Sequence, residues 1–257
     1  MDHQSGEFAQ KLRYASDIIR GSKNIVVLTG AGISTPSGIP DFRSSESGLW
    51  TRYDPFEYAS INAFRYHPQK FFDWMRPLAK LIFAAEPNAA HYGLAQLEKS
   101  GYLHTVITQN IDGLHQKAGS QNVLEVHGTL TTLSCVSCFK KVDSFAYLQP
   151  YLEHGEIPQC PDCKSILKPN AVLFGEQLPY QAWLGAQEAS RNSDLMIVAG
   201  SSLEVLPVAG LPMSAIDHGS HLIVINQTGT YIDVRADIVF TRDVAEVIPQ
   251  IVHELLV

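Results

Sequence analysis

The sequence predicts an α/β fold in which a parallel sheet is covered by helices on both faces. Several short segments, among them residues 25–28 and 195–199, are apolar throughout, which is typical of strands buried on both sides. Segments with helical spacing of apolar residues lie between them, and this alternation favours a parallel sheet. Each apolar segment also ends in small or polar residues, and ligands bind at such positions in open α/β sheets.

Helical patterns and apolar strands alternate along the chain. In the helical segments the apolar residues recur at helical spacing, and glycine or proline stands near several of the boundaries. Helices are predicted over residues 8–19, 68–83 and 87–101 and from residue 243 onward, where Pro249 kinks the last helix or marks its start. Strands are predicted at residues 25–28, 103–108, 123–126, 195–199, 222–225 and 236–240.

Five of the predicted strands end in a cluster of small or polar residues. Because the carboxyl ends of parallel strands share one edge of a sheet, these clusters are expected to line a single crevice. Any one cluster is explained equally well as an ordinary loop, whereas five together indicate a ligand site. The clusters begin at Gly30, Gln109, His127, Gly200 and Asn226.

Composition and charge indicate a soluble globular protein. The 257 residues are 45% apolar and 18% charged, which suits one substantial core with a small inserted module. The formal net charge of −7 argues against a broad basic face, so no direct nucleic-acid binding is expected. The polar N-terminus lacks the apolar region of a secretory signal, and no apolar run reaches the roughly 18 residues of a membrane span. The expected location is therefore cytoplasmic, with no membrane partner.

Four cysteines form two C-x2-C pairs, Cys135 with Cys138 and Cys160 with Cys163. The 21 residues between the pairs slightly exceed the usual spacing of about 15–20 for zinc-binding pairs. Four thiolates leave no open coordination position, so the pattern predicts one structural Zn²⁺ rather than a catalytic one. Redox dithiols and unliganded core cysteines are the alternatives. The segment interrupts the series of sheet strands, and its mixed charge argues against a surface that tracks phosphates.

The loop at residues 29–43, TGAGISTPSGIPDFR, follows the first strand and begins like a phosphate-binding loop. It lacks the lysine of a P-loop, and Thr35 stands where a G-x-G-x-x-G fingerprint has its third glycine. Gly30 and Gly32 still permit a tight turn and close backbone approach to a pyrophosphate. No acid has a clear match to the one expected about 20 residues further on, and Asn226 is a candidate for that contact with the adenine ribose. These residues alone indicate an unusual dinucleotide site or a rigid structural turn.

Further motifs follow one another along nearly the whole chain. Besides the two C-x2-C pairs, they are Gly30-Ala-Gly-Ile-Ser34, Gly38-Ile-Pro-Asp-Phe-Arg43, Thr108-Gln-Asn-Ile-Asp112 with Leu114-His115, Val126-His-Gly128, Lys168-Pro-Asn170, Phe174-Gly-Glu176 and Gly200-Ser-Ser202. In this order they resemble the sirtuin family. The resemblance implies NAD-dependent protein-lysine deacetylation by a Rossmann-type large domain with a small domain of zinc ribbon and helices. It assigns residues 1–44, 88–130 and 170–257 to the large domain, 45–87 to the helical part of the small domain and 131–169 to the zinc ribbon.

Carried over to matching positions, the resemblance implies a site for NAD and for acetylated-lysine proteins or peptides. His127 and Asn110 would be catalytic, and Cys135, Cys138, Cys160 and Cys163 would hold the zinc. An extended peptide would add as a strand between two edges, formed by Val172, Leu173, Phe174 and Gly175 and by Leu203, Glu204 and Val205. The NAD contacts would be Gly30, Ala31, Gly32, Ser34, Thr35, Phe42, Arg43, Gln109, Ile111, Asp112, Gly200, Ser201, Ser202, Asn226, Gln227 and Val244.

The reaction that the resemblance implies is acyl transfer to ADP-ribose rather than hydride transfer. The acetyl oxygen of the substrate lysine attacks C1′ of the ribose and nicotinamide leaves, yielding deacetylated lysine and O-acetyl-ADP-ribose. A neutral imidazole near pH 7 suits removal of a proton from the ribose hydroxyls, so His127 is the expected general base. His91 and His115 match family positions and are interpreted as structural. Asp41 either contacts nicotinamide or braces its loop.

Two other classes of function remain as alternatives, and a sequence feature of one helix predicts which acyl group is removed. The alternatives are a non-catalytic NAD or ADP-ribose-binding module and an ADP-ribosyltransferase that uses the same loop. Family members that remove succinyl or malonyl groups carry Tyr-x-x-Arg in the helix after the cofactor loop. Here Phe72 stands at the tyrosine and Met75 at the arginine, with Arg76 about 100° further around the helix. Acetyl or longer uncharged acyl groups are therefore expected.

Overall fold

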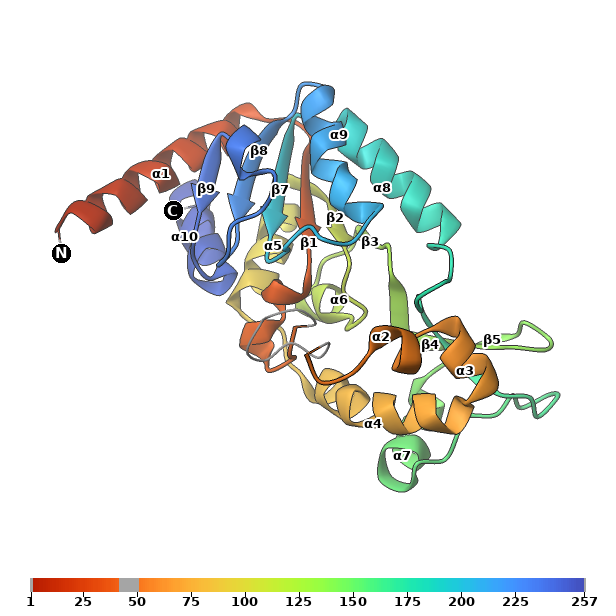
Figure 1. Ribbon diagram of the computed structural model, residues 1–257. Helices are drawn as coiled ribbons and strands as arrows, with labels where there is room; N and C mark the ends of the chain where they lie inside the picture. The colour runs from red at the N-terminus through yellow and green to blue at the C-terminus, as the bar shows by residue number, and fades with distance from the viewer. Residues whose placement is uncertain (1, 42–50, 257) are drawn as a thin grey trace.

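The computed structural model describes residues 2–41 and 51–256, apart from the side chains of residues 2–5. Phe42 and Arg43, two of the predicted cofactor contacts, lie outside the described residues. Figure 1 shows a large sheet flanked by helices and, below it, a smaller group of helices and strands. No helix in the described ranges is long and apolar enough to cross a membrane.

Six parallel strands form the main sheet, in the order β3-β2-β1-β7-β8-β9. Numbered in chain order among themselves, they lie 3-2-1-4-5-6, which is the Rossmann arrangement and confirms the predicted fold class. The strand order reverses between β1 and β7, and ligands of such sheets bind outside the carboxyl ends of the strands at this switch point. The strands are β1 (Ile25–Thr29), β2 (Leu103–Thr108), β3 (Val123–Glu125), β7 (Leu195–Ala199), β8 (His221–Ile225) and β9 (Ile238–Phe240).

Helices cover both faces of the main sheet because successive strand residues point to opposite sides. Ile25 and Val27 belong to one apolar core, whereas Val26 and Leu28 belong to the other. Residues of α1 (Asp2–Gly21), α5 (Ala89–Lys99) and α10 (Val244–Leu256) complete the first core, and residues of α8 (Tyr180–Asn192) and α9 (Leu211–Asp217) complete the second. Both faces are therefore shielded, which explains the fully apolar strands.

The small module, defined here as α2, α3, α4, α6, α7 and strands β4 to β6, has its own apolar core. Phe71 and Phe72 of α4 lie at its centre, and Tyr151 of α7 donates a hydrogen bond from its hydroxyl to the carbonyl of Phe72 at 2.6 Å. Strand β4 pairs antiparallel with both β5 and β6. The elements are α2 (Pro55–Tyr58), α3 (Ile61–Tyr66), α4 (Pro68–Ala84), α6 (Leu114–Ala118), α7 (Phe145–His154), β4 (Gly128–Cys135), β5 (Lys141–Asp143) and β6 (Leu167–Ala171). The domain boundaries given above stay a prediction.

Some elements differ from the sequence prediction. Helix α10 begins at Val244 and continues through Pro249, so the alternative that Pro249 marks the start is wrong. Helix α8 was not predicted: of its side chains only Ala186 and Ser190 are fully buried, and its inward face otherwise consists of the half-buried Trp183 and Ala189, a weak apolar stripe. Short 3-10 helices, also not predicted, are η1 (Ala31–Ile33), η2 (Thr35–Ser37), η4 (Val208–Gly210) and η5 (Asp233–Arg235).

Candidate active site

A cavity of about 480 Å³ opens at the carboxyl ends of the main strands. All five strand-end clusters contribute to its wall, as expected for loops that leave one edge of a parallel sheet. The residues that line it are Gly30, Ala31, Gly32, Thr35, Asp41, Gln109, Asn110, His127, Gly200, Ser201, Ser202, Leu203, Glu204, Val205, Asn226, Gln227, Thr228, Gly229, Arg242 and Val244.

Glycines bring the loops after β1 and β7 into direct backbone contact. The N–H of Gly32 donates to the carbonyl of Gly200 at 2.8 Å. Gly200 has a φ of +64°, and a Cβ on it would lie 2.4 Å from the nitrogen of Ile33. A Cβ on Gly30 would lie 2.9 Å from the Gly200 carbonyl oxygen. Side chains at these positions do not fit, so the floor of the cavity is backbone and can approach a pyrophosphate closely.

Ser34 does not line the cavity but is buried behind the residues that do, with 1% of its surface exposed. Its hydroxyl donates to Oδ2 of Asp112 at 2.7 Å and accepts from the amide of Asn110 at 3.0 Å. The same Asn110 amide donates to the carbonyl of Gly30 at 3.0 Å. Ser34 and Asp112 therefore orient Asn110, which lines the cavity, whereas Ser34, Ile111 and Asp112 themselves do not line it.

The ring orientation of His127 is set by a backbone carbonyl. Its Nδ1 lies 3.1 Å from the carbonyl oxygen of Gln109. A carbonyl oxygen can only accept, so Nδ1 carries the proton and the neutral ring has its lone pair on Nε2. The Gln109 side chain in turn donates to the hydroxyl of Ser201 at 2.9 Å. A proton acceptor thus sits on the cavity wall in a fixed tautomer.

Burial perturbs three ionisable groups behind the cavity. Burial raises the pKa of Asp112, and hydrogen bonds from the Leu114 N–H and the Ser34 hydroxyl oppose that rise. Burial lowers the pKa of His91 to about 4. Burial, together with the neighbouring His91, lowers the pKa of His115 to about 3. Both imidazoles are therefore neutral near pH 7, and a hydrogen bond of 3.0 Å joins His115 Nε2 to the Thr29 hydroxyl.

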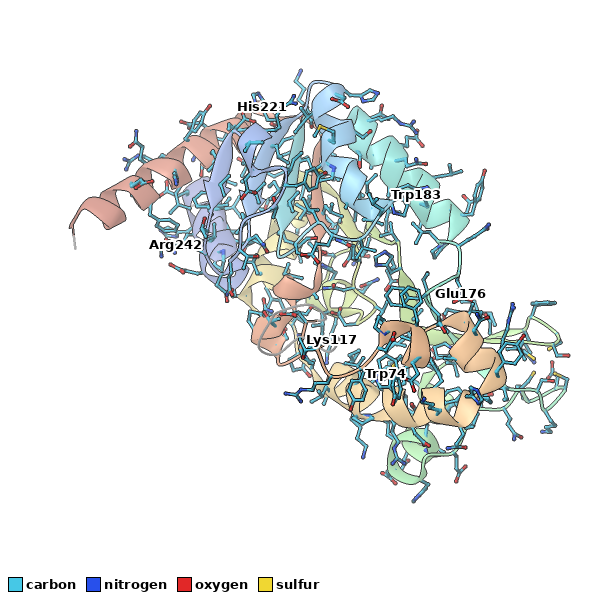
Figure 2. The ribbon with its side chains drawn as sticks, viewed as in Figure 1. Trp74, Lys117, Glu176, Trp183, His221 and Arg242 are labelled. Carbon is cyan, nitrogen blue, oxygen red and sulfur yellow. The ribbon has the colours of Figure 1, made fainter. Side chains whose placement is uncertain are left out.

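The end of the cavity beside β8 and β9 contains residues that the sequence prediction missed. Thr228 and Gly229 directly follow Asn226 and Gln227, and Arg242 follows β9. Arg242, labelled in Figure 2, lies 4.4 Å over the ring of Phe8 and bonds Glu246 at 2.6 Å. The cluster after β8 would have included Thr228 and Gly229 if it had been extended by two residues. A sixth cluster, after β9, would have included Arg242.

The two predicted peptide edges differ in position. Leu203, Glu204 and Val205 line the cavity, whereas the segment of residues 172–175 does not. Two of its N–H groups are already bonded to backbone, since Val172 donates to the carbonyl of His127 at 2.8 Å and Phe174 to that of Ala59 at 2.9 Å. The next residue, Gly175, is exposed and has a φ of +87°.

The four cysteines gather at one point of the ribbon and suit a single metal ion. Their sulfurs all lie within 4.8 Å of one another, and the closest pairs are 3.4 to 3.7 Å apart. A zinc ion held tetrahedrally at about 2.3 Å needs sulfurs roughly 3.8 Å apart, so the donor set fits. The turns at the two C-x2-C pairs have the same backbone geometry. Phe139 and Lys164, the residues that follow the pairs, both have a positive φ. The N–H of Phe139 donates to the carbonyl of Cys135, and that of Lys164 to the carbonyl of Cys160.

Comparison with known proteins gives one consistent result. A family model described as "Sir2 family" matches residues 30–207. A protein from Archaeoglobus fulgidus, described as "NAD-dependent protein deacylase 2", is 44% identical and covers 95% of this chain and 96% of its own. The "NAD-dependent protein deacetylase" of Sulfolobus acidocaldarius is 42% identical, over 96% of each chain.

Solved structures agree over a similar length. One described as "Structural Basis for the Mechanism and Regulation of Sir2 Enzymes" has a TM-score of 0.89 and 43% identity, covering 96% of this chain and 98% of its own. Another, described as "Sir2-p53 peptide-NAD+", has a TM-score of 0.86 and 40% identity, covering 95% of this chain and 98% of its own.

Proposed function

The chain belongs to the Sir2 family, and we propose on that basis that it is an NAD-dependent protein-lysine deacetylase. The observation that carries the proposal is the identity of 41–47% over most of the chain with proteins described as NAD-dependent deacetylases or deacylases. A non-catalytic binding module and an ADP-ribosyltransferase are not favoured by these relatives.

The cavity suits NAD in size and in chemistry. Its volume of about 480 Å³ lies within the range of roughly 300–1,000 Å³ usual for small-molecule sites. Gly30, Gly32 and Gly200 would lie against the pyrophosphate, where only backbone fits. Asn226 and Gln227 would hold the adenine ribose at the opposite end. When bound, NAD supplies an electrophilic ribose carbon at which nicotinamide is replaced by the acyl oxygen.

His127 is the proposed general base. Because Nδ1–H donates to the Gln109 carbonyl, Nε2 is the atom that would accept a proton from a ribose hydroxyl. Asn110, held by Gly30 and Ser34, would orient the nicotinamide ribose beside it. A site that excludes water from the reacting carbon would limit hydrolysis.

The partner is proposed to be an acetylated lysine in an extended peptide. Related structures are described with a p53 peptide and with a propionylated peptide. Phe72 and Met75 are 2% and 4% exposed in the apolar core of the small module. Arg76 lies against Gly155 at the end of α7, where a Cβ on the glycine would meet its guanidinium at 2.6 Å. Uncharged acyl groups are therefore proposed over succinyl or malonyl groups.

Mass spectrometry of an acetylated peptide, incubated with and without NAD, tests the proposal. We expect deacetylated peptide, nicotinamide and O-acetyl-ADP-ribose only when NAD is present. A matched succinylated peptide should turn over much more slowly, and comparable rates would contradict the proposed acyl preference. Transfer of ADP-ribose to a protein without deacetylation would instead support the transferase alternative.

A further inference from the structure

Asn88 lies outside the cavity yet connects a rigid helix to the loop that forms its floor. We propose that Asn88 is a positioning residue for the cofactor loop, defined as residues 30–38. This inference rests on the proposed function, because the loop matters as part of an NAD site. Asn88 is the N-cap residue of α5, which packs in the first core of the main sheet.

The oxygen of the Asn88 side chain caps the helix. Oδ1 accepts a hydrogen bond from the N–H of Ala90 at 2.9 Å, and the Asn88 N–H donates to Nδ1 of His91 at 3.3 Å. The His91 ring is fully buried and lies 4.9 Å from the His115 ring. These contacts fix Asn88 to the start of α5, whose residues Leu94 and Leu97 are buried in the first core of the main sheet.

The nitrogen of the same side chain holds the loop. Nδ2 donates to the carbonyl of Ile33 at 2.8 Å and to the hydroxyl of Ser37 at 2.9 Å. Ile33 ends η1 and Ser37 ends η2, so one amide group ties both turns of the loop to α5. Aspartate and serine cap helices as well as asparagine, but only asparagine can cap with its oxygen and donate two hydrogen bonds with its nitrogen.

A loop held in this way is ordered before the ligand arrives. Gly30, Ala31, Gly32 and Thr35 of the cofactor loop line the cavity. If the loop were released, NAD binding would have to order it again, and affinity would fall without any loss of a direct contact. The expected signature is a weaker affinity for NAD with a nearly unchanged rate at saturating NAD.

The variant Asn88→Ser separates the two roles of the side chain. Serine retains the helix cap but is too short to reach the loop. We expect the Kd of NAD, measured by calorimetry, to rise about tenfold for the loss of two hydrogen bonds, while kcat at saturating NAD stays within about twofold. Asn88→Ala should raise the Kd equally and also lower the unfolding midpoint further, by about 2–4 °C, because the cap is lost as well.

A matched control removes a helix-start hydrogen bond elsewhere. Asp143→Ala deletes the bond to the Phe145 N–H at the start of α7 and should leave the Kd of NAD unchanged. An unchanged Kd in Asn88→Ser would overturn the proposal, whatever the effect on stability. The test measures NAD binding and does not depend on deacetylation. A wild-type protein that binds NAD but deacetylates no peptide would therefore refute the proposed function and leave the role of Asn88 open to the same test.

Discussion

His127 lies between β3 and β4, and its Nδ1–H donates to the carbonyl of Gln109 3.1 Å away. Whether a histidine at a strand end is structural or catalytic cannot be decided from its own sequence neighbours. Its position decides which chemistry is available to it, because His127 lines the same cavity as Gln109, Asn110 and Ser202. His91 and His115 show the contrast, since both are buried, neutral and outside the cavity.

Replacing His127 with alanine tests its role as a base. The variant His127→Ala should lower deacetylation by at least about 10²-fold, since general-base catalysis contributes roughly 10²–10⁴-fold. NAD binding should persist because the pyrophosphate and adenosine contacts are unchanged. Deacetylation measured by mass spectrometry and NAD affinity measured by calorimetry check the two statements. The exposed His253→Ala is the matched control, and equal activity of both variants would contradict the assignment.

The loops after β1 and β7 form the floor of the cavity through a contact that only glycine permits. At Gly200 the positive φ and the 2.4 Å approach to Ile33 act together. Gly200→Ala should therefore destabilise the protein by at least ~3 kcal/mol and abolish measurable NAD binding. Gly210→Ala is the control, because a Cβ there meets nothing within 4 Å. Denaturant unfolding and calorimetry measure both effects, and similar behaviour of the two variants would refute the close-contact explanation.

The ribbon of β4, β5 and β6 has only a small apolar cluster of its own, around Leu133 and Leu167. Such a module depends on its metal for stability. Purified protein should contain one zinc ion per chain by elemental analysis. Cys160→Ser should lose it and reduce deacetylation at least about tenfold. Ser137→Ala, at an exposed position between two ligands, should retain both, and full activity of a zinc-free Cys160→Ser protein would contradict a structural role.

The whole molecule should lose stability as the pH falls below about 6.5, the ordinary pKa of histidine. Burial holds the pKa of His91 at about 4 and that of His115 at about 3. The unfolded chain therefore binds two protons that the folded chain excludes, and stability that is complete above pH 6.5 is lost on acidification. The expected loss between pH 6.5 and 5 is about 1.6 kcal/mol for each histidine.

Denaturant unfolding at several pH values measures this loss. His91→Gln should reduce the slope of stability against pH by about half, because one of the two protons is no longer linked to unfolding. The absolute stability of the variant is not the test, since removing a buried ring costs stability at every pH. A variant with the same slope as the wild type would contradict the assignment.

The sequence predicted the main sheet well because its strands are largely apolar on both faces and end in small or polar residues. Among other elements it missed the short helices α7 and α9, α8 with only two fully buried side chains, and the 3-10 turns of the cofactor loop. Most predicted cofactor contacts lie in one cavity, since the carboxyl ends of parallel strands must converge. Asn88 was not identified as a loop contact, because that role depends on Ile33 and Ser37, more than 50 residues away in sequence, packing beside it.

The stoichiometry of the reaction tests the assigned function most directly. Wild-type protein, NAD and an acetylated peptide are combined, and nicotinamide, deacetylated peptide and O-acetyl-ADP-ribose are quantified in the same sample over time. We expect the three products to form in equal amounts and none to form when the peptide carries unmodified lysine. Release of nicotinamide without deacetylation of the peptide, or deacetylation in the absence of NAD, would contradict an NAD-dependent deacetylase.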